Sequence, residues 1–395
     1  MSERFLSPRV TAVPPSGIRR FFDIAGTMKG AISLGVGEPD FVTPYHIRNA
    51  AMDSLLAGET QYTANRGLLS LRAEIAEYLT RRFDVSYDPE TEILVTIGAS
   101  EAIDLALRIS IEPGDEVLVP DPGYVSYAPC VTFAGGTPVP LTTRAENGFR
   151  IDPEALEKAI TPRTKALIFP YPNNPTGAVM RRQHLEALAP VIERHDLLVI
   201  SDEIYAELTY EGAEHTSIAA LPGFKDRTIL INGFSKAFAM TGWRLGYACA
   251  PAALTAQMNK IHQYTIMCAP RQSQVAAEEA LRTGRENGYK DILTMRDSYD
   301  QRRRLMVDAF TRMGLSCHTP EGAFYCFPSI QSTGLTSEEF CTRLLKTEKV
   351  VCVPGTAFGP SGEGHIRCCY ATGLKQLTEA FLRIERFVWQ LGVNK

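Results

Sequence analysis

The middle of the chain alternates short apolar runs, rich in β-branched residues, with stretches whose apolar positions recur at helical spacing. Several runs are apolar at consecutive positions, as in Ala166-Leu-Ile-Phe169, which is typical of strands covered by helices on both faces. The pattern predicts an α/β fold with a mainly parallel sheet. The expected strands are Ile93–Gly98, Glu116–Pro120, Ala166–Tyr171, Leu197–Asp202, Thr228–Gly233 and Leu245–Ala250, and the expected helices include Ser100–Ile109, Pro153–Ile160 and Gln183–His195.

The pattern changes after residue 280. A long helical stretch from Tyr289 to Met313 ends before Gly314, which suits a helix C-terminus. We expect residues 281–395 to form a smaller α+β domain, residues 46–280 the large domain, and residues 1–45 an N-terminal arm and part of the small domain. A cleft between the two domains would bind the ligand. The small domain is expected to contain the strands Ala323–Phe327, Val350–Val353 and His365–Tyr370 and a final helix Leu374–Leu391.

Composition narrows the class of protein. The 395 residues are 45% hydrophobic with a net charge of −4, and the basic residues are scattered, which argues against nucleic acid or an anionic membrane as a partner. No apolar run approaches the roughly 20 residues that span a bilayer, and the N-terminus lacks the apolar segment of a secretory signal. We therefore expect a cytoplasmic protein. Its nine cysteines lack CxxC spacing, so we expect reduced, mostly buried thiols and no metal site.

Lys236 directly follows an expected strand, within the glycine-rich apolar stretch from Asn232 to Gly246. A solvated lysine with a pKa near 10.4 is a poor nucleophile at pH 7, whereas a desolvated lysine can form an imine with an aldehyde. Arg244, eight residues further on, can approach the same pocket and hold an anion. Taken alone, a lysine after a strand is more often a surface residue.

Polar residues also follow two other expected strands. Asp202 ends one of them, in Ser201-Asp-Glu-Ile-Tyr205. An isolated buried carboxylate is costly, so this acid needs a partner such as a pyridinium nitrogen; a helix N-cap is the alternative. Asn174 lies in Tyr171-Pro-Asn-Asn-Pro-Thr-Gly177, whose prolines and glycine favour a rigid turn. That turn either satisfies its own backbone or holds a hydrogen-bond donor at the edge of the sheet.

Two further turns complete the set. Ala99 and Ser100 lead from a strand into a helix, where backbone N–H groups at the positive helix end can seat a phosphate. Tyr124, in Asp121-Pro-Gly-Tyr, either stacks on a flat cofactor or fills the core. All five motifs follow carboxyl ends of expected strands, so we expect them to meet at one edge of the sheet, with Arg367 approaching from the small domain.

Together these motifs resemble the class I/II aminotransferases of fold type I, the aspartate aminotransferase superfamily, and more narrowly its bacterial and archaeal branch. The resemblance runs from Leu34-Gly-Val-Gly-Glu-Pro-Asp-Phe41 to His365-Ile-Arg-Cys-Cys-Tyr-Ala371, and its most specific motif is Ser235-Lys236 through Gly246. It implies a seven-stranded, mainly parallel sheet between helices. It also implies a pyridoxal 5'-phosphate (PLP) enzyme that moves an amino group between an L-amino acid and a 2-oxo acid, through internal aldimine, external aldimine and ketimine.

The resemblance also implies a role for each residue. Lys236 carries the cofactor and moves the substrate proton, and Asp202 keeps the pyridine nitrogen protonated. Arg367 grips the substrate α-carboxylate with its fork of donors, and the backbone of Gly37 approaches the same group. The remaining contacts are Asn174 and Tyr205 to the phenolic oxygen, Tyr124 on the ring face, and Ala99, Ser100, Ser235 and Arg244 on the phosphate, with Tyr124 and Asn174 also beside the substrate.

Tyr62 matches a tyrosine that relatives lend to the neighbouring subunit's phosphate, so the resemblance implies a homodimer with shared active sites. Some aspartate-acting relatives carry a lysine where this chain has Ser100, and an arginine near the stretch occupied by Tyr264. Arg271 either substitutes as a receptor for a side-chain carboxylate or faces solvent. We expect glutamate and 2-oxoglutarate as one substrate pair, and aspartate, alanine or aromatic amino acids as the other.

Three other functions compete with transamination. A different PLP reaction on this scaffold, such as a C–S β-lyase, needs the same lysine and aspartate, and acceptance of the amino group by 2-oxoglutarate discriminates it. A non-catalytic ligand sensor is disfavoured because the fold fills the whole chain and Lys236 is intact. A nicotinamide-dependent dehydrogenase is disfavoured because no GxGxxG opens a helix after the first strand.

Overall fold

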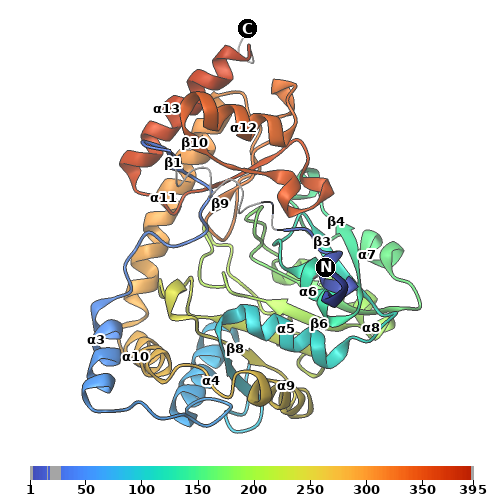
Figure 1. Cartoon of the computed structure of the whole chain (residues 1–395), viewed down its shortest axis with the longest axis vertical. Coiled ribbons are helices and arrows are strands. Elements are labelled where there is room, and N and C mark those ends of the chain that lie inside the picture. Colours follow the sequence, from blue (N-terminus) through green and yellow to red (C-terminus); the bar gives the residue numbers. More distant parts are fainter. Residues whose placement is uncertain (1–2, 16, 18–27, 393–395) are drawn as a thin grey trace.

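The computed structural model describes residues 3–15, 17 and 28–392. A seven-stranded sheet lies at its centre, in the order β2-β8-β7-β6-β5-β3-β4 (Figure 1). β8 is antiparallel to both neighbours and every other pair is parallel, so the sheet is mainly parallel, as the sequence predicted. The strands are β2 (Ile93–Thr96), β3 (Glu116–Asp121), β4 (Thr137–Thr142), β5 (Thr164–Phe169), β6 (Leu198–Asp202), β7 (Thr228–Gly233) and β8 (Gly246–Cys249).

Helices cover both faces of this sheet. One face packs against α5, α6 and α9, and the other packs against α4, α7, α8 and α10. Side chains of β5 alternate between the two cores: Ala166 and Ile168 face the first group, and Leu167 and Phe169 face the second. The consecutive apolar run therefore reflects burial on both sides. The helices are α4 (Leu69–Phe83), α5 (Gly98–Ser110), α6 (Tyr127–Ala134), α7 (Pro153–Ala159), α8 (Arg182–Arg194), α9 (Ala252–Thr265) and α10 (Arg271–Asn287).

The seventh strand, β4, was not among those expected from the hydrophobic pattern. Its sequence Thr137-Pro-Val-Pro-Leu-Thr contains two prolines, and proline cannot donate to a strand ladder. The structure accommodates them because β4 lies at the edge of the sheet and pairs only with β3. An edge strand needs donors on one side alone, so the prolines cost little there.

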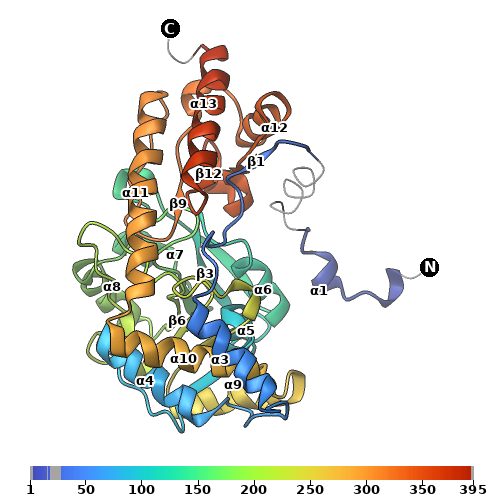
Figure 2. The ribbon, with the colours of Figure 1, turned by 90° about the vertical axis from the view of Figure 1, so that its left-hand side faces the viewer.

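The chain after α10 forms most of a second layer above the sheet. α11 (Lys290–Arg312) extends from the lower helices up to α13 (Leu374–Gln390), as Figure 2 shows. A three-stranded antiparallel sheet has the order β11-β12-β9. Its long helices and short strands agree with the α+β pattern predicted from the sequence. The remaining elements here are β9 (Tyr325–Cys326), β10 (Val350–Val351), β11 (Val353–Pro354), β12 (Ile366–Cys369) and α12 (Ser337–Glu348).

The expected single strand Val350–Val353 is wrong in one respect. Cys352 separates β10 from β11, and the two strands join different sheets. β10 pairs in parallel with β1 (Ile32–Ser33), which joins the N-terminal segment to the C-terminal layer. Residues 1–2, 16 and 18–27 of that segment lie outside the described residues, and the domain limits at 45 and 280 stay a prediction. The N-terminal helices are α1 (Pro8–Thr11) and α3 (Tyr45–Leu56).

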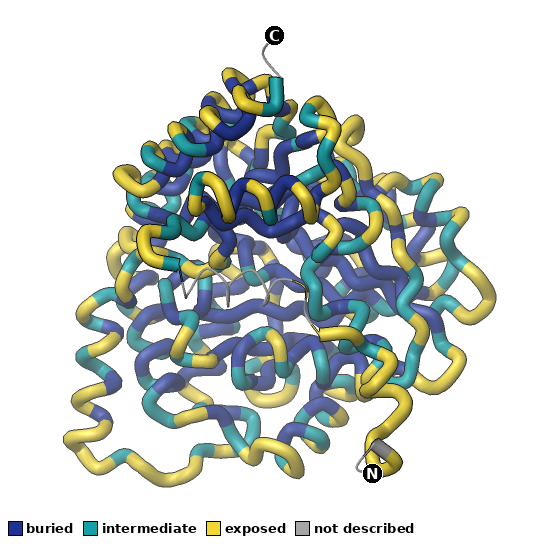
Figure 3. The backbone as a smooth tube through the Cα atoms, turned by 45° about the horizontal axis from the view of Figure 1, so that its top comes forward, coloured by how far each residue is buried: buried dark blue, intermediate teal, exposed yellow. Residues whose placement is uncertain are grey.

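Buried residues run continuously from the central sheet into the C-terminal layer (Figure 3). Within the described part of the chain, no helix combines the length and the apolar character that crossing a membrane requires. All nine cysteines are free thiols, and six of them are buried. Short 3-10 turns complete the structure: η1 (Glu3–Phe5), η2 (Ala145–Asn147), η3 (Ile218–Ala220), η4 (Lys225–Arg227), η5 (Thr241–Trp243), η6 (Gln331–Thr333), η7 (Gly355–Phe358) and η8 (Pro360–Gly362).

Candidate active site

A cavity of about 1210 Å³ lies between the carboxyl edge of the sheet and the C-terminal layer. Because β8 is antiparallel to both neighbours, β2 runs in the same direction as β7, and their following turns meet at this edge. The cavity brings together all but one of the predicted site residues, since Tyr62 does not line it. Those that line it are Gly37, Ala99, Ser100, Tyr124, Asn174, Asp202, Tyr205, Ser235, Lys236, Arg244 and Arg367.

Lys236 enters the cavity from the turn after β7. Its Nζ donates to the carbonyl oxygen of Gly37 at 2.7 Å and lies 5.8 Å and 5.6 Å from the ring centroids of Tyr205 and Phe324. Burial among these groups lowers the pKa of Lys236 to about 8, although the nearby Cys369 and Glu38 oppose the shift. The amine is therefore more often neutral at pH 7 than a solvated lysine, which is the condition for attack on an aldehyde.

Asp202 ends β6 with only 6% of its surface exposed. The hydroxyl of Tyr127 donates to its Oδ2 at 2.7 Å, and the backbone N–H of Ile204 donates to its Oδ1 at 3.2 Å. Burial raises the pKa of Asp202 above its ordinary value, and the hydrogen bonds from Tyr127 and Ile204 oppose that shift. The sequence analysis expected the buried Asp202 to have a partner. Tyr127 is one such partner, and the sequence analysis did not identify it.

Arg367 reaches the cavity from β12. Its Nη1 donates to Oδ1 of Asn174 at 2.9 Å, and its Nη2 donates to the carbonyl oxygen of Gly35 at 2.5 Å. The guanidinium carbon lies 4.4 Å from the ring centroid of Tyr325 and 4.7 Å from that of Phe358. Its Nε is buried without a hydrogen-bond partner among the described residues. The side chain is thus a fixed, desolvated cation.

Tyr205 and Tyr325 form a hydroxyl pair at the wall of the cavity. Their oxygens lie 2.8 Å apart, and both side chains are buried. A Cβ on Gly37 would collide with the hydroxyl oxygen of Tyr325, so a larger residue does not fit there without moving the tyrosine. The glycine therefore lets the backbone pass close to both Lys236 and Tyr325.

The start of α5 forms the opposite wall. Gly98 has φ +68°, and a Cβ there would lie 2.7 Å from Nη2 of Arg244, so the guanidinium packs directly on the first turn of the helix. The first N–H groups of a helix have no acceptor within it. Glu101 caps this end by accepting from the N–H of Ile97 at 2.6 Å, and its other oxygen lies 2.6 Å from Nδ1 of the buried His262. A helix N-terminus beside an arginine suits a phosphate.

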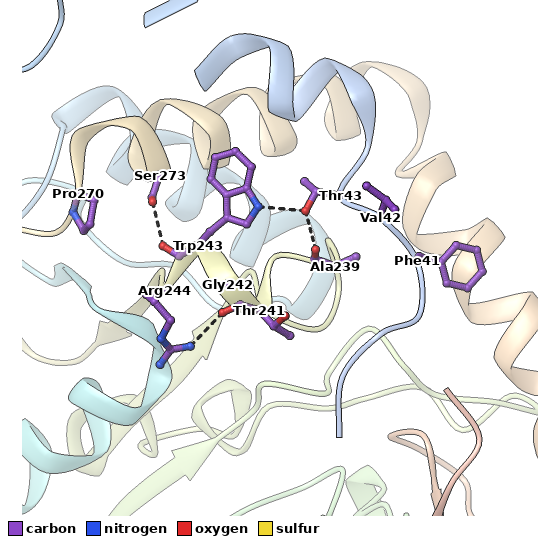
Figure 4. A pocket seen from close by; sticks show the side chains of 10 residues that line it. All are labelled: Phe41, Val42, Thr43, Ala239, Thr241, Gly242, Trp243, Arg244, Pro270 and Ser273. Atoms are coloured by element: carbon purple, nitrogen blue, oxygen red, sulfur yellow. Dashed lines mark hydrogen bonds between the residues drawn. The ribbon is translucent and has the colours of Figure 1, made fainter. Parts of the chain in front are cut away.

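A second hollow of about 600 Å³ adjoins the cavity and shares Thr241, Gly242 and Arg244 with it. In Figure 4 the indole Nε1 of Trp243 donates to Oγ1 of Thr43, which in turn donates to the carbonyl oxygen of Ala239. These bonds, at 3.0 and 2.6 Å, tie the segment before α3 to the turn that carries Arg244.

Tyr62 and Arg271, whose role the sequence left open, lie outside the cavity. The side chain of Tyr62 is 77% exposed and does not line the cavity of its own chain. Arg271 begins α10 and forms an ion pair with Glu59, at 3.2 Å between Nη2 and Oε2. It does not line the cavity and its side chain is 25% exposed, and the choice between the two interpretations of Arg271 stays a prediction.

The lining residues that the sequence reasoning missed include three with ionisable side chains: Glu38, Tyr127 and Tyr325. Glu38 adjoins Gly37 in the quoted Gly-Glu-Pro-Asp motif, so its position could have been inferred. Tyr127 lies three residues after Tyr124 and could have been placed on the same turn. Tyr325 had no such signal, because its strand looks like ordinary core in the sequence.

The residues present fit PLP. A desolvated amine and a buried carboxylate line one cavity, and a cation lies beside the N-terminus of α5 in the same space. This is the donor set that an aldehyde, a pyridinium and a phosphate require. The buried Nε of Arg367 also lacks a partner among the described residues, so the cavity retains capacity for an anionic group near it.

Comparisons with known proteins agree with this chemistry. The family profile of aminotransferase class I and II matches residues 29–384. The chain is 48% identical to the aspartate aminotransferase of Pyrococcus abyssi (strain GE5 / Orsay), over 96% of this chain and 97% of that protein. It is 46% identical to aromatic-amino-acid aminotransferase 2 of Thermococcus litoralis (strain ATCC 51850 / DSM 5473 / JCM 8560 / NS-C), over the same shares of both chains.

Among solved structures, the crystal structure of Pyrococcus protein-A1 superposes with a TM-score of 0.95 at 47% identity, covering 98% of this chain and 99% of that one. The match in sequence and in fold extends over nearly every residue that builds the cavity. The chain therefore belongs to the class I and II aminotransferases, and it is a PLP-dependent transaminase of fold type I.

Proposed function

We propose that this transaminase exchanges an amino group between glutamate and 2-oxoglutarate as one pair, and an uncharged, preferably aromatic, amino acid and its 2-oxo acid as the other. The observation that carries the site assignment is that Lys236 and Asp202 line one cavity. No observation favours the C–S β-lyase reaction over transamination.

Two residues would do the central chemistry. When bound, PLP supplies an aldehyde that captures amines and a cationic ring that accepts electrons. Lys236 Nζ would anchor that aldehyde and, once free, would take the proton from the substrate Cα. The carboxylate of Asp202 would hold the proton on the ring nitrogen, and burial would strengthen this charge pair because water would not screen it.

The other lining residues of the cavity suggest the remaining contacts to the cofactor. Asn174 and Tyr205 would donate to the phenolic oxygen, and Tyr124 would cover the ring face. Ala99, Ser100 and Ser235 would donate to the phosphate, and Arg244 would balance its charge. The packing of the Arg244 guanidinium on Gly98 supports this assignment, because it fixes the cation at the helix end.

Arg367 would bind the substrate α-carboxylate with two parallel donors. Its bond to Asn174 and its packing on Tyr325 and Phe358 hold the guanidinium plane before substrate arrives. The backbone of Gly37 would lie against the same carboxylate. Preorganisation of this kind lowers the entropy lost on binding.

The preference for an uncharged amino acid over aspartate in the second pair rests on the charges that line the cavity, and the side-chain carboxylate of glutamate would be held by neutral hydroxyl and backbone N–H donors instead of a cation. Among its described lining residues, the lysine and arginines are Lys236, Arg244 and Arg367, and each has a proposed partner in the cofactor or the α-carboxylate. Ser100 offers no positive charge, and Arg271 is engaged by Glu59. Relatives named for aspartate and for aromatic amino acids are about equally similar to this chain in sequence. Their names therefore do not favour either substrate, and the proposal rests on the residues of the cavity.

We also propose a homodimer with shared sites in the cytoplasm. Tyr62, 77% exposed, would enter the partner's phosphate region, and the hollow beside Arg244 has room for such a side chain. Exposed apolar side chains on α3 support a covered face there. They are Tyr45, Met52, Leu55 and Leu56.

Borohydride reduction of the protein after loading with PLP tests the anchor. Peptide mapping by mass spectrometry should place the reduced adduct on Lys236, and a Lys236→Ala variant should carry none. An adduct on another lysine would refute the assignment. A panel of amino donors with 2-oxoglutarate, ranked by kcat/KM, tests the substrate; aspartate ranking above phenylalanine and tyrosine would overturn the proposed preference.

A further inference from the structure

Tyr127 makes two contacts with residues proposed to hold the cofactor ring. It is the first residue of α6, and only 3% of its surface is exposed. Its hydroxyl donates to Oδ2 of Asp202 at 2.7 Å. Its ring meets the ring of Tyr124 edge to face, with centroids 5.4 Å apart and planes at 80°. The side chain of Tyr127 thus contacts both the carboxylate of Asp202 and the ring of Tyr124.

The hydrogen bond from Tyr127 to Asp202 matters because burial disfavours the ionised form of this carboxylate. Burial raises the pKa of Asp202 and so favours the neutral acid, and the negative charge of the neighbouring Glu203 adds to that effect. The hydrogen bonds from Tyr127 and Ile204 and the charge of Lys236 oppose it. A neutral acid cannot pair with a ring nitrogen as a charge, so the contacts that oppose the upward pKa shift of Asp202 favour the charged pair.

Tyr127 is suited to the task at any working pH. Burial, together with the charge of Asp202, raises the pKa of Tyr127 well above its ordinary value, so its hydroxyl remains a donor. The backbone N–H of Tyr127 also donates to the carbonyl oxygen of Tyr124 at 3.1 Å, which fixes the turn between them. The hydroxyl therefore has little freedom to turn away from the carboxylate.

We propose that Tyr127 is a positioning residue that keeps Asp202 ionised and aimed at the pyridine nitrogen of the cofactor. The inference rests on the proposed role of Asp202 and extends it. A buried tyrosine that merely satisfies its hydroxyl would stabilise the fold without discriminating between ligands that differ at the ring nitrogen. That difference gives the test.

The experiment measures the affinity of the apoprotein for PLP and for 1-deazapyridoxal 5'-phosphate, in which a C–H replaces the ring nitrogen. Tyr127→Phe keeps the ring that packs on Tyr124 and removes only the hydroxyl. We expect this variant to bind PLP about ten-fold more weakly, as for loss of one hydrogen bond to a charged group. Its affinity for the deaza analogue should change less than roughly two-fold.

Two further variants separate the possible failures. Tyr205→Phe, which removes a hydroxyl that does not touch Asp202, should weaken both ligands by the same factor. Asp202→Asn should abolish the preference for PLP over the analogue. If Asp202→Asn keeps that preference, the role of Asp202 fails and the inference fails with it.

If Asp202→Asn behaves as expected but Tyr127→Phe binds PLP as tightly as the wild type, or weakens both ligands equally, only the role of Tyr127 is overturned. Affinity for the deaza analogue also serves as a check on folding, because it requires the rest of the cavity intact. A Tyr127→Phe variant that binds neither ligand contradicts the inference, since its remaining aromatic ring was expected to preserve the packing.

Discussion

Burial against aromatic rings removes water from both the amine of Lys236 and the guanidinium of Arg367. Lys236 lies against the rings of Tyr205 and Phe324, and Arg367 lies against Tyr325 and Phe358. Aromatic surroundings remove water but attract cations weakly through their faces. The lysine is thereby biased toward its neutral form, while the arginine, which cannot lose its proton in a protein, stays charged.

The pH dependence of Lys236 follows from its lowered pKa of about 8. A depressed lysine pKa means that the neutral, reactive amine accumulates as pH rises through 8, earlier than for a solvated lysine. At pH 7 roughly one amine in ten is neutral, against about one in 2,500 for an unperturbed lysine. Labelling the apoprotein with a limiting acylating reagent across pH, read by mass spectrometry, should show this midpoint. The exposed Lys158 is an internal reference; identical profiles for the two would contradict the prediction.

Replacing Arg367 by lysine keeps the charge but loses the paired donors. We expect kcat/KM for amino acids to fall about 100-fold, mostly through KM, because a point charge cannot reproduce the bidentate contact. An amine that lacks a carboxylate, such as phenethylamine, should react with the variant as slowly as with the wild type. A matching loss for that amine would show that Arg367 acts on something other than the α-carboxylate.

At the scale of elements, the phosphate seat depends on how tightly α5 meets the turn after β7. A Cβ on Gly98 would collide with Arg244, and a Cβ on Gly246 would lie 2.5 Å from the backbone nitrogen of Ala99. Glycine at both positions lets a helix start, a strand and a guanidinium share one small volume. We therefore expect most substitutions at Gly98 and Gly246 to weaken binding of the cofactor phosphate.

Gly98→Ala tests this close approach. Both Gly98→Ala and Gly288→Ala place alanine at a left-handed position, φ +68° and +71°, and each should cost about 1–2 kcal/mol in the free energy of unfolding. Gly288 caps α10 with nothing near its missing Cβ, so it serves as the control. Only Gly98→Ala should weaken PLP binding, by about ten-fold as Arg244 is displaced. Urea unfolding and cofactor titration measure the two effects; equal binding in both variants would refute the argument.

Sequence reasoning succeeded where chemistry is local and failed where it depends on tertiary contact. Asp202 and Lys236 follow buried strands within distinctive motifs, so their place at one sheet edge could be predicted, and the cavity contains both. Tyr325 could not, because its position depends on β9 lying across from Tyr205. β4 was missed because its two prolines are tolerated only at the edge of a sheet, and its edge position is known only from the full strand order. Glu59, which engages Arg271, lies 212 residues away in sequence.

At the scale of the whole molecule, the exposed Tyr62 and the apolar residues of α3 predict that one chain completes its partner's site. Mixing Tyr62→Ala and Lys236→Ala subunits should regenerate about a quarter of wild-type activity, because half of randomly paired dimers are hybrids with one intact site. Each variant alone should be nearly inactive. Absence of recovered activity, although mass spectrometry shows that subunits have exchanged, would rule out shared sites.

The cavity is assembled from Gly37 near the start of the chain, Asp202 and Lys236 in the middle, and Arg367 near the end. No short contiguous fragment of the chain contains it. The visible absorbance of the captured cofactor should therefore act as a gauge of whether the entire polypeptide has reached its native arrangement. Damaged or truncated variants should lose this absorbance even where each remaining segment keeps its own secondary structure.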